Sequence, residues 1–156
     1  MKPTVSVVTP FHAARARNGM LERCAASVRA QTVPVHHILA EDIHHEGASV
    51  TRTHGLALVE TEWTAFLDSD DEMDRDHIEQ LLACAQDTGA DYVYPWFRVV
   101  GGSDPFPAFF GLPWDDNAPH CTTITILVRT GLARQVGLYG QYNADWKFPL
   151  GCVASA

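Results

Sequence analysis

The chain has 156 residues, 46% of them hydrophobic, and a formal net charge of −8, which is the composition of one globular domain. The acidic balance argues against a nucleic-acid backbone as partner, and no apolar run approaches the ~20 residues of a membrane span. The sequence opens without a signal-peptide pattern, so we expect a cytoplasmic protein. Its four cysteines are widely spaced, which favours buried free thiols over disulfides or a zinc site.

Strands and helices are predicted to alternate through the first two thirds of the chain. In chain order we expect a strand at 5–9, a helix at 20–30, a strand at 37–40, a helix at 50–60, a strand at 63–67, a helix that Asp74 caps and Gly89 closes, and a strand at 92–94. This alternation predicts an α/β fold with a mostly parallel central sheet flanked by helices. Ligands of such sheets bind at the carboxyl ends of the strands.

The character of the sequence changes after residue 100. Residues 101–120 are rich in Gly and Pro but carry Phe109, Phe110 and Trp114, which favour a loop that packs or binds a sugar face. A strand follows at 122–128, and a short helix at 131–135 ends near Gly137. We find no internal repeat and no second domain, so one domain is expected over 1–156.

Polar residues gather where three of the predicted strands end. They are Thr9-Pro10-Phe11-His12 after the first strand, Glu41-Asp42 after the second, and Asp68-Ser69-Asp70-Asp71 after the third. The carboxyl ends of parallel strands meet at one edge of a sheet, and we therefore expect these three clusters to converge on one site.

The third cluster holds three carboxylates within four positions. Clustered carboxylates repel one another, so they need a cation or strong hydrogen bonds to compensate. Mg²⁺ and Mn²⁺ take oxygen ligands and bridge one or two carboxylates to substrate phosphates. In extended chain, Asp68 and Asp70 point to the same side, as two ligands of one ion would. The alternative is that these acids favour the positive end of the helix that follows.

Eight histidines raise the question of a second metal site. The pairs His36-His37 and His44-His45 lack the i, i+4 spacing of a helical zinc motif, and no cysteine lies beside them. We interpret them as solvated loop histidines.

An ordered set of residues resembles glycosyltransferase family 2. The set is Ser6-Val7-Val8-Thr9-Pro10-Phe11, Leu21, Ser27, Gln31-Thr32, Asp42, Arg52, Gly55, Phe66 to Glu72, Val128-Arg129-Thr130, Val136-Gly137 and Asp145-Trp146, and it covers nearly the whole chain. The resemblance implies a compact GT-A fold, with a nucleotide-sugar-binding half at 1–100 and a short acceptor-side portion at 101–156. It also implies a divalent metal (Mn²⁺ or Mg²⁺) and a nucleotide-diphosphate sugar donor, with a UDP-sugar favoured and a GDP-sugar possible. The sugar passes to an acceptor hydroxyl with inversion at the anomeric carbon.

The resemblance also assigns roles in donor binding, position by position. Thr9 and Phe11, with Pro10 between them, match residues that cradle the nucleoside base, for which core packing of Phe11 is the alternative. Asp42 matches the acid that accepts a hydrogen bond from the base, and its alternative is a turn residue. Arg52 matches an arginine near the nucleotide, where the alternative is an ion pair with one of the clustered aspartates.

The acidic motif and the late part of the chain carry the remaining roles. Asp68, with Ser69 beside it, matches the position near the ribose, and Asp70 matches the metal ligand, whereas Asp71 fits the start of the following helix. Asp145 matches the aspartate that takes the acceptor proton.

This sequence departs from the family pattern around some of these positions. Ala144 stands where the family has a second acid, Ile43 to Glu46 replaces a Gly/Ser-rich turn, and Thr53 stands where Asn is common. The chain ends eleven residues after Asp145, so we expect a minimal enzyme, a truncated one, or a donor-binding remnant.

Two other functions stay open beside the glycosyltransferase. One is a nucleotide-sugar binding module with little turnover. The other is a nucleotidyltransferase-like enzyme, which shares the sheet and the carboxylate–metal chemistry. That class carries a Gly-rich basic phosphate loop after the first strand, and here residues 12–19 are basic but hold only one glycine, Gly19.

Overall fold

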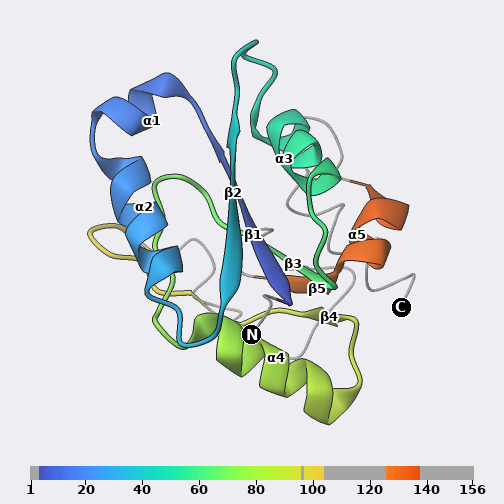
Figure 1. Cartoon of the computed structure of the whole chain (residues 1–156). Coiled ribbons are helices and arrows are strands. Elements are labelled where there is room, and N and C mark those ends of the chain that lie inside the picture. The colour runs from blue at the N-terminus through green and yellow to red at the C-terminus, as the bar shows by residue number, and fades with distance from the viewer. Residues whose placement is uncertain (1–3, 96, 104–125, 138–156) are drawn as a thin grey trace.

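A five-stranded sheet forms the centre of the molecule (Figure 1). The computed structural model describes residues 4–95, 97–103 and 126–137. The strands are β1 (Val5–Phe11), β2 (Val35–Glu41), β3 (Trp63–Phe66), β4 (Tyr92–Val93) and β5 (Leu127–Arg129), in the order β2-β1-β3-β5-β4. β1 runs parallel to β2 and β3, whereas β5 is antiparallel to β3 and β4. All strands except β5 therefore point in the same direction, which confirms the predicted mostly parallel sheet, with β5 making it mixed.

Helices cover both faces of this sheet. They are α1 (Ala13–Arg17), α2 (Met20–Arg29), α3 (Ala48–Ala57), α4 (His77–Thr88) and α5 (Thr130–Val136). Alternation along β1 sends Val5 and Val7 into one apolar cluster with α2 and α4, and Val8 into another with α3 and α5. Each face of the sheet therefore has its own core, which leaves the strand ends as the place where a ligand can bind the described part of the chain.

β1 is longer than predicted and contains Pro10. The Leu67 N–H donates to the Val8 carbonyl on the β3 side, and the Asp42 N–H donates to the Phe11 carbonyl on the β2 side. By this alternation the nitrogen of Pro10 points toward β3, whose pairing with β1 ends at Val8. The missing N–H therefore costs no ladder bond, and the strand continues to Phe11 at the edge of the site.

The predicted start of α4, the helix expected to begin at Asp74, is wrong. α4 begins at His77 with Asp76 as its N-cap residue, not at Asp74. The backbone carbonyl of Asp74 instead accepts hydrogen bonds from the His77 N–H and the Gln31 side chain. A polar residue before an apolar run marks a helix start only approximately, because a preceding turn uses the same residue types.

α3 lies unusually close to the sheet. A Cβ on Gly55 would stand 2.4 Å from Cγ1 of Val8 and 3.4 Å from Cβ of Ala40. Only a residue without a side chain fits at this crossing. The close approach holds α3 against β1 and β2 beside the strand ends.

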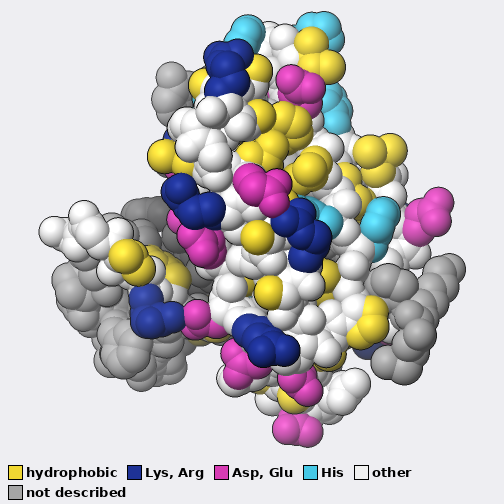
Figure 2. Space-filling model, turned by 60° about the vertical axis from the view of Figure 1, so that its left-hand side comes forward, with side chains coloured by type: hydrophobic (Ala, Val, Ile, Leu, Met, Phe, Trp, Pro, Cys, Tyr) yellow, Lys and Arg dark blue, Asp and Glu magenta, His cyan; other side chains and the backbone are white. Residues whose placement is uncertain are grey.

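Charges of both signs alternate on the surface that carries α1 and α2, where basic side chains lie beside acidic ones (Figure 2). Arg29 pairs with Glu22 at 2.5 Å, and Arg23 with Glu72 at 3.5 Å, in exposed positions. Such exposed pairs contribute at most about 1 kcal/mol each.

The cysteines and the hydrophobic segments bear on the remaining expectations. Cys24 is a buried free thiol as predicted, but Cys84, also free, is exposed, so the expectation of burial is wrong for it. No helix among the described residues combines the length and hydrophobicity needed to cross a membrane. Most of the predicted aromatic loop lies outside the described residues.

Candidate functional site

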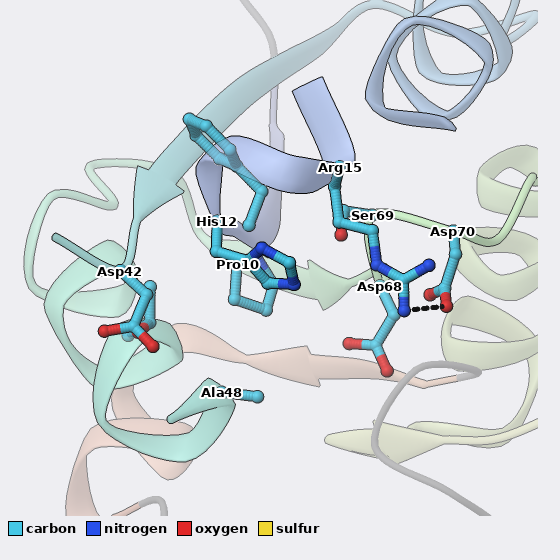
Figure 3. A pocket seen from close by; sticks show the side chains of 10 residues that line it. Pro10, His12, Arg15, Asp42, Ala48, Asp68, Ser69 and Asp70 are labelled. Carbon is cyan, nitrogen blue, oxygen red and sulfur yellow. Dashed lines mark ion pairs between the residues drawn. The ribbon is translucent and has the colours of Figure 1, made fainter. Parts of the chain in front are cut away.

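A pocket of about 240 Å³ opens at the carboxyl ends of β1, β2 and β3 (Figure 3). Its lining consists of Pro10, Phe11, His12, Arg15, Asp42, Ala48, Thr51, Asp68, Ser69 and Asp70. All three strand-end clusters identified in the sequence contribute to this lining. Among the predicted site residues, it brings together Pro10, Phe11, Asp42, Asp68, Ser69 and Asp70.

Two arginines neutralise the carboxylates of the acidic motif. Arg52, on α3 and only 5% exposed, donates from Nη2 to Oδ1 of Asp68 at 2.5 Å. Arg15, on α1, places Nη2 2.9 Å from Oδ2 of Asp70. Arg52 is absent from the pocket lining, so its ion pair with Asp68 is the alternative that the sequence left open for it.

The third carboxylate of the motif sits in a negative field. Burial raises the pKa of Asp71 above its ordinary value, the charges of Asp68 and Asp70 raise it further, and Arg15 opposes them. The Asp71 N–H donates to the Asp68 carbonyl, closing a tight turn after β3. Asp71 does not line the pocket. A cation in the pocket would relieve this repulsion.

The C-terminal end of α2 holds the segment that follows the acidic motif. The Gln31 amide donates to the Asp74 carbonyl at 2.8 Å and accepts from the Ile78 N–H at 3.1 Å. The Ser27 hydroxyl accepts from the Met73 N–H, and the Thr32 N–H donates to the Arg75 carbonyl. Sequence reasoning quoted Ser27, Gln31 and Thr32 only as part of the family likeness and missed this positioning role.

Asp42 lies opposite the acidic motif and anchors a turn. Its Oδ1 accepts from the Glu46 N–H at 2.8 Å, and its Oδ2 from the Gly47 N–H at 3.0 Å. Contact with the protein opposes ionisation, but these two hydrogen bonds, helped by His45 and His12, hold the pKa of Asp42 below its ordinary value. Asp42 is therefore an anion that still has a lone pair on each oxygen to offer toward the pocket.

Thr9 is the one described nucleotide-binding candidate, besides Arg52, that does not line the pocket. Its hydroxyl is fully buried on the opposite face of β1, 2.9 Å from Nε2 of His37 and 3.8 Å from Sγ of Cys24. Burial raises the pKa of the Cys24 thiol to about 11, so this sulfur stays protonated and unreactive.

The same network makes the stability of the fold depend on pH. Burial, with the positive charge of Arg29 and the neighbouring His36, lowers the pKa of His37 from 6.5 to about 4. Because the folded state holds His37 neutral, the folded state is favoured fully above pH 6.5, where His37 is neutral in the unfolded chain too. This contribution to the free energy of unfolding is lost as the pH falls toward 4. His37→Gln should reduce this acid loss by about 1–2 kcal/mol, allowing for the partly exposed ring.

Denaturant unfolding at pH 7 and pH 4.5 measures the effect of this substitution. The exposed His54 on α3 is the control, since it does not act on the pKa of His37 and His54→Gln should leave the acid loss unchanged. His77, whose pKa burial lowers against the charges of Asp74 and Asp76, keeps part of the pH dependence in both variants. Equal acid losses in wild type and His37→Gln would contradict the assignment.

The carboxylates of the pocket can bind a hard divalent ion if the ligand supplies the remaining oxygen atoms. No group of three His, Cys, Asp or Glu side chains in the described part of the chain could hold a metal. Asp68 and Asp70 offer carboxylate oxygens into one pocket, which suits Mg²⁺ or Mn²⁺ when a substrate phosphate and water complete the shell. The site therefore fits a metal that arrives with an anionic ligand.

Arg15, Ala48 and Thr51 line the pocket but were missed in the sequence, and one predicted residue cannot be placed. Arg15 lies in the basic segment after β1, which was considered only as a phosphate loop, whereas His12 belongs to a strand-end cluster that was expected at the site. The position of Arg15 could have indicated its role, since a basic residue shortly after the first strand lies at the same sheet edge as the acidic motif. Asp145, the predicted base, lies outside the described residues.

Comparison with known proteins finds a family and a set of similar folds. Residues 38–109 match the family described as Glycosyl transferase family 2. No curated protein matches the sequence.

The similar folds include solved structures of two proteins, TarS and PcManGT. Residues 1–349 of TarS from S. aureus in complex with UDP-GlcNAc superpose with a TM-score of 0.80 at 15% identity, covering 96% of this chain and 53% of that one. The same protein in complex with UDP gives a TM-score of 0.77 at 16% identity, covering 93% and 53%. The mannosyltransferase PcManGT from Pyrobaculum calidifontis, in complex with GDP-Man and Mn²⁺, gives 0.70 at 15% identity, covering 94% and 50%. The chain thus has their fold and spans about half the length of each.

Proposed function

We propose that this chain, whose residues 38–109 match the glycosyltransferase family 2 model and whose fold is that of GT-A glycosyltransferases, transfers a sugar from a nucleotide-diphosphate donor to an acceptor hydroxyl. The observation that carries the proposal is the pocket at the strand ends, where Asp68 and Asp70 face Asp42 across a space of about 240 Å³. Acidic side chains on two sides of one pocket suit a ligand that brings hydrogen-bond donors at one end and a metal-bound diphosphate at the other.

The donor is proposed to lie across the pocket with its base at Asp42. Pro10 and Phe11 flank the base, and Asp42 accepts a hydrogen bond from one of its N–H groups. Asp68, fixed by Arg52, accepts from the ribose, with Ser69 beside it. Thr9 has an indirect role: it does not contact the donor, but its buried hydroxyl packs behind the strand that carries Pro10 and Phe11. A UDP-sugar is the favoured donor and a GDP-sugar the second choice, because similar folds hold UDP-GlcNAc, UDP and GDP-Man.

The reaction is proposed to be a single displacement with inversion. The acceptor oxygen bonds to the anomeric carbon as the bond from that carbon to the diphosphate oxygen breaks. Asp145 takes the hydroxyl proton, and the nucleoside diphosphate leaves. Asp70, with Asp68, would hold Mn²⁺ or Mg²⁺, which when bound supplies positive charge to the leaving diphosphate.

A thermal-shift panel tests donor binding. UDP, GDP, their sugars and the matching nucleoside monophosphates are each added with and without Mn²⁺. A ligand that binds only the folded state raises the melting temperature by mass action, so one diphosphate series should raise it, and more with Mn²⁺. No shift with any nucleotide would contradict the proposal.

Turnover then separates an enzyme from a nucleotide-sugar binding module, the second candidate, because the same pocket would serve both. Release of the nucleoside diphosphate from the donor that binds, measured with and without an acceptor panel, supports the enzyme. Tight binding with no release supports the module.

A further inference from the structure

Arg15 is the basic residue of α1 that reaches the acidic motif. Its guanidinium extends from α1 into the pocket toward Asp68 and Asp70, and the ion pair goes to Asp70 (Figure 3). Arg15 and Asp70 are both partly exposed, at 32% and 41% of their side chains. The Asp70 carboxylate is proposed above as the metal ligand, so the Arg15 guanidinium pairs with the same group that a divalent ion would bind.

The contact between Arg15 and Asp70 is one that a ligand could exchange. A partly exposed ion pair contributes little free energy, so a divalent ion can displace it at small cost. The other terminal nitrogen of Arg15, Nη1, donates to Sδ of Met20, a weak acceptor, at 2.8 Å. By contrast, Arg52 is almost fully buried against Asp68 and lies outside the pocket lining. Arg15 is therefore the arginine of the site that can turn to a new anion.

We propose that Arg15 is a diphosphate-binding residue that rests on Asp70 until metal and donor arrive. The inference rests on the proposed function. When the divalent ion binds Asp70, Arg15 loses its partner while two phosphates enter the same pocket. A guanidinium fork matches phosphate oxygens, so the freed side chain binds the diphosphate. The metal therefore binds the protein–nucleotide complex more tightly than the free protein, and the nucleotide binds the protein–metal complex more tightly than the free protein.

The substitution Arg15→Gln makes two opposite predictions. Manganese alone, followed by its electron paramagnetic resonance signal, should bind about two- to fivefold more tightly, because no arginine competes for Asp70. UDP or GDP, whichever the wild type prefers, should bind at least tenfold more weakly at saturating Mn²⁺ by isothermal titration, because a charged hydrogen bond to phosphate is lost. Arg15→Lys should recover part of the nucleotide affinity.

Arg17→Gln is the matched control, since it makes the same charge change on the same exposed helix outside the pocket lining. It should leave both affinities at their wild-type values. Unchanged manganese affinity in Arg15→Gln would overturn the proposal, and so would unchanged nucleotide affinity. Failure of the wild type to bind any nucleotide with Mn²⁺ would instead contradict the proposed function, so the two failures are distinguishable.

Discussion

Asp70→Asn should abolish the manganese dependence of nucleotide binding while leaving the fold intact. An amide oxygen carries no net charge and is a much poorer ligand for a hard divalent ion than a carboxylate. The side chain is partly exposed at the pocket, so the substitution creates no cavity and buries no polar atom. Isothermal titration of the preferred nucleoside diphosphate with and without Mn²⁺ should give two different affinities for wild type and one for the variant.

Glu72→Gln is the control for Asp70→Asn. Glu72 lies two residues further on, outside the pocket lining, and pairs with Arg23 on the surface. The substitution removes the same charge from the same segment, so any long-range electrostatic effect appears in both variants. Manganese dependence retained in a folded Asp70→Asn, or lost equally in Glu72→Gln, would refute Asp70 as the ligand.

Gly55→Ala should destabilise the protein by about 2 kcal/mol although alanine is the better helix former. The added methyl group would stand 2.4 Å from Cγ1 of Val8, which is fully buried on a central strand. Such overpacking costs about 1–3 kcal/mol, and we expect the upper end because the contacted Val8 side chain is β-branched and fully buried. The gain of roughly 1 kcal/mol in helix propensity offsets only part of this cost. Nucleotide binding should weaken too, because α3 carries Ala48 and Thr51 of the pocket wall.

Gly131→Ala provides the matched comparison for Gly55. Gly131 is also helical, in α5, and a Cβ there would meet nothing within 4 Å. Alanine should therefore stabilise the protein at position 131 and destabilise it at position 55. Urea unfolding of the two variants and wild type measures both signs. Equal changes at the two positions would contradict the close approach of α3.

The main helices and strands of this fold could be anticipated because their signals are local. Apolar residues of α2 recur on one face, and β1 and β3 are short apolar runs. α1 has five residues and buries none of them, so it left no periodic signal. The extension of β1 through Pro10 also left no local signal, because it depends on where the neighbouring β3 ends.

The site followed from the sequence only as far as its strand-end residues. Asp42, Asp68 and Asp70 converge because parallel strands end at one edge, which the alternation of elements implied. The partners of these acids could not be derived, since Arg15 and Arg52 reach them from helices whose orientation only tertiary packing decides. Thr9 faces the opposite core because alternation on β1 sends Pro10, not Thr9, toward α3.

The bonds from Gln31 to the segment after the acidic motif all end on backbone atoms at that segment. These hydrogen bonds depend on where the backbone runs and not on which side chains stand at 74, 75 and 76. Those positions can accept many residue types while the loop keeps its course, whereas a change at Gln31 would remove two of the loop's hydrogen bonds whatever its own sequence. Engineering at this edge of the sheet should therefore diversify residues 74–76 and leave Gln31, just after α2, unchanged.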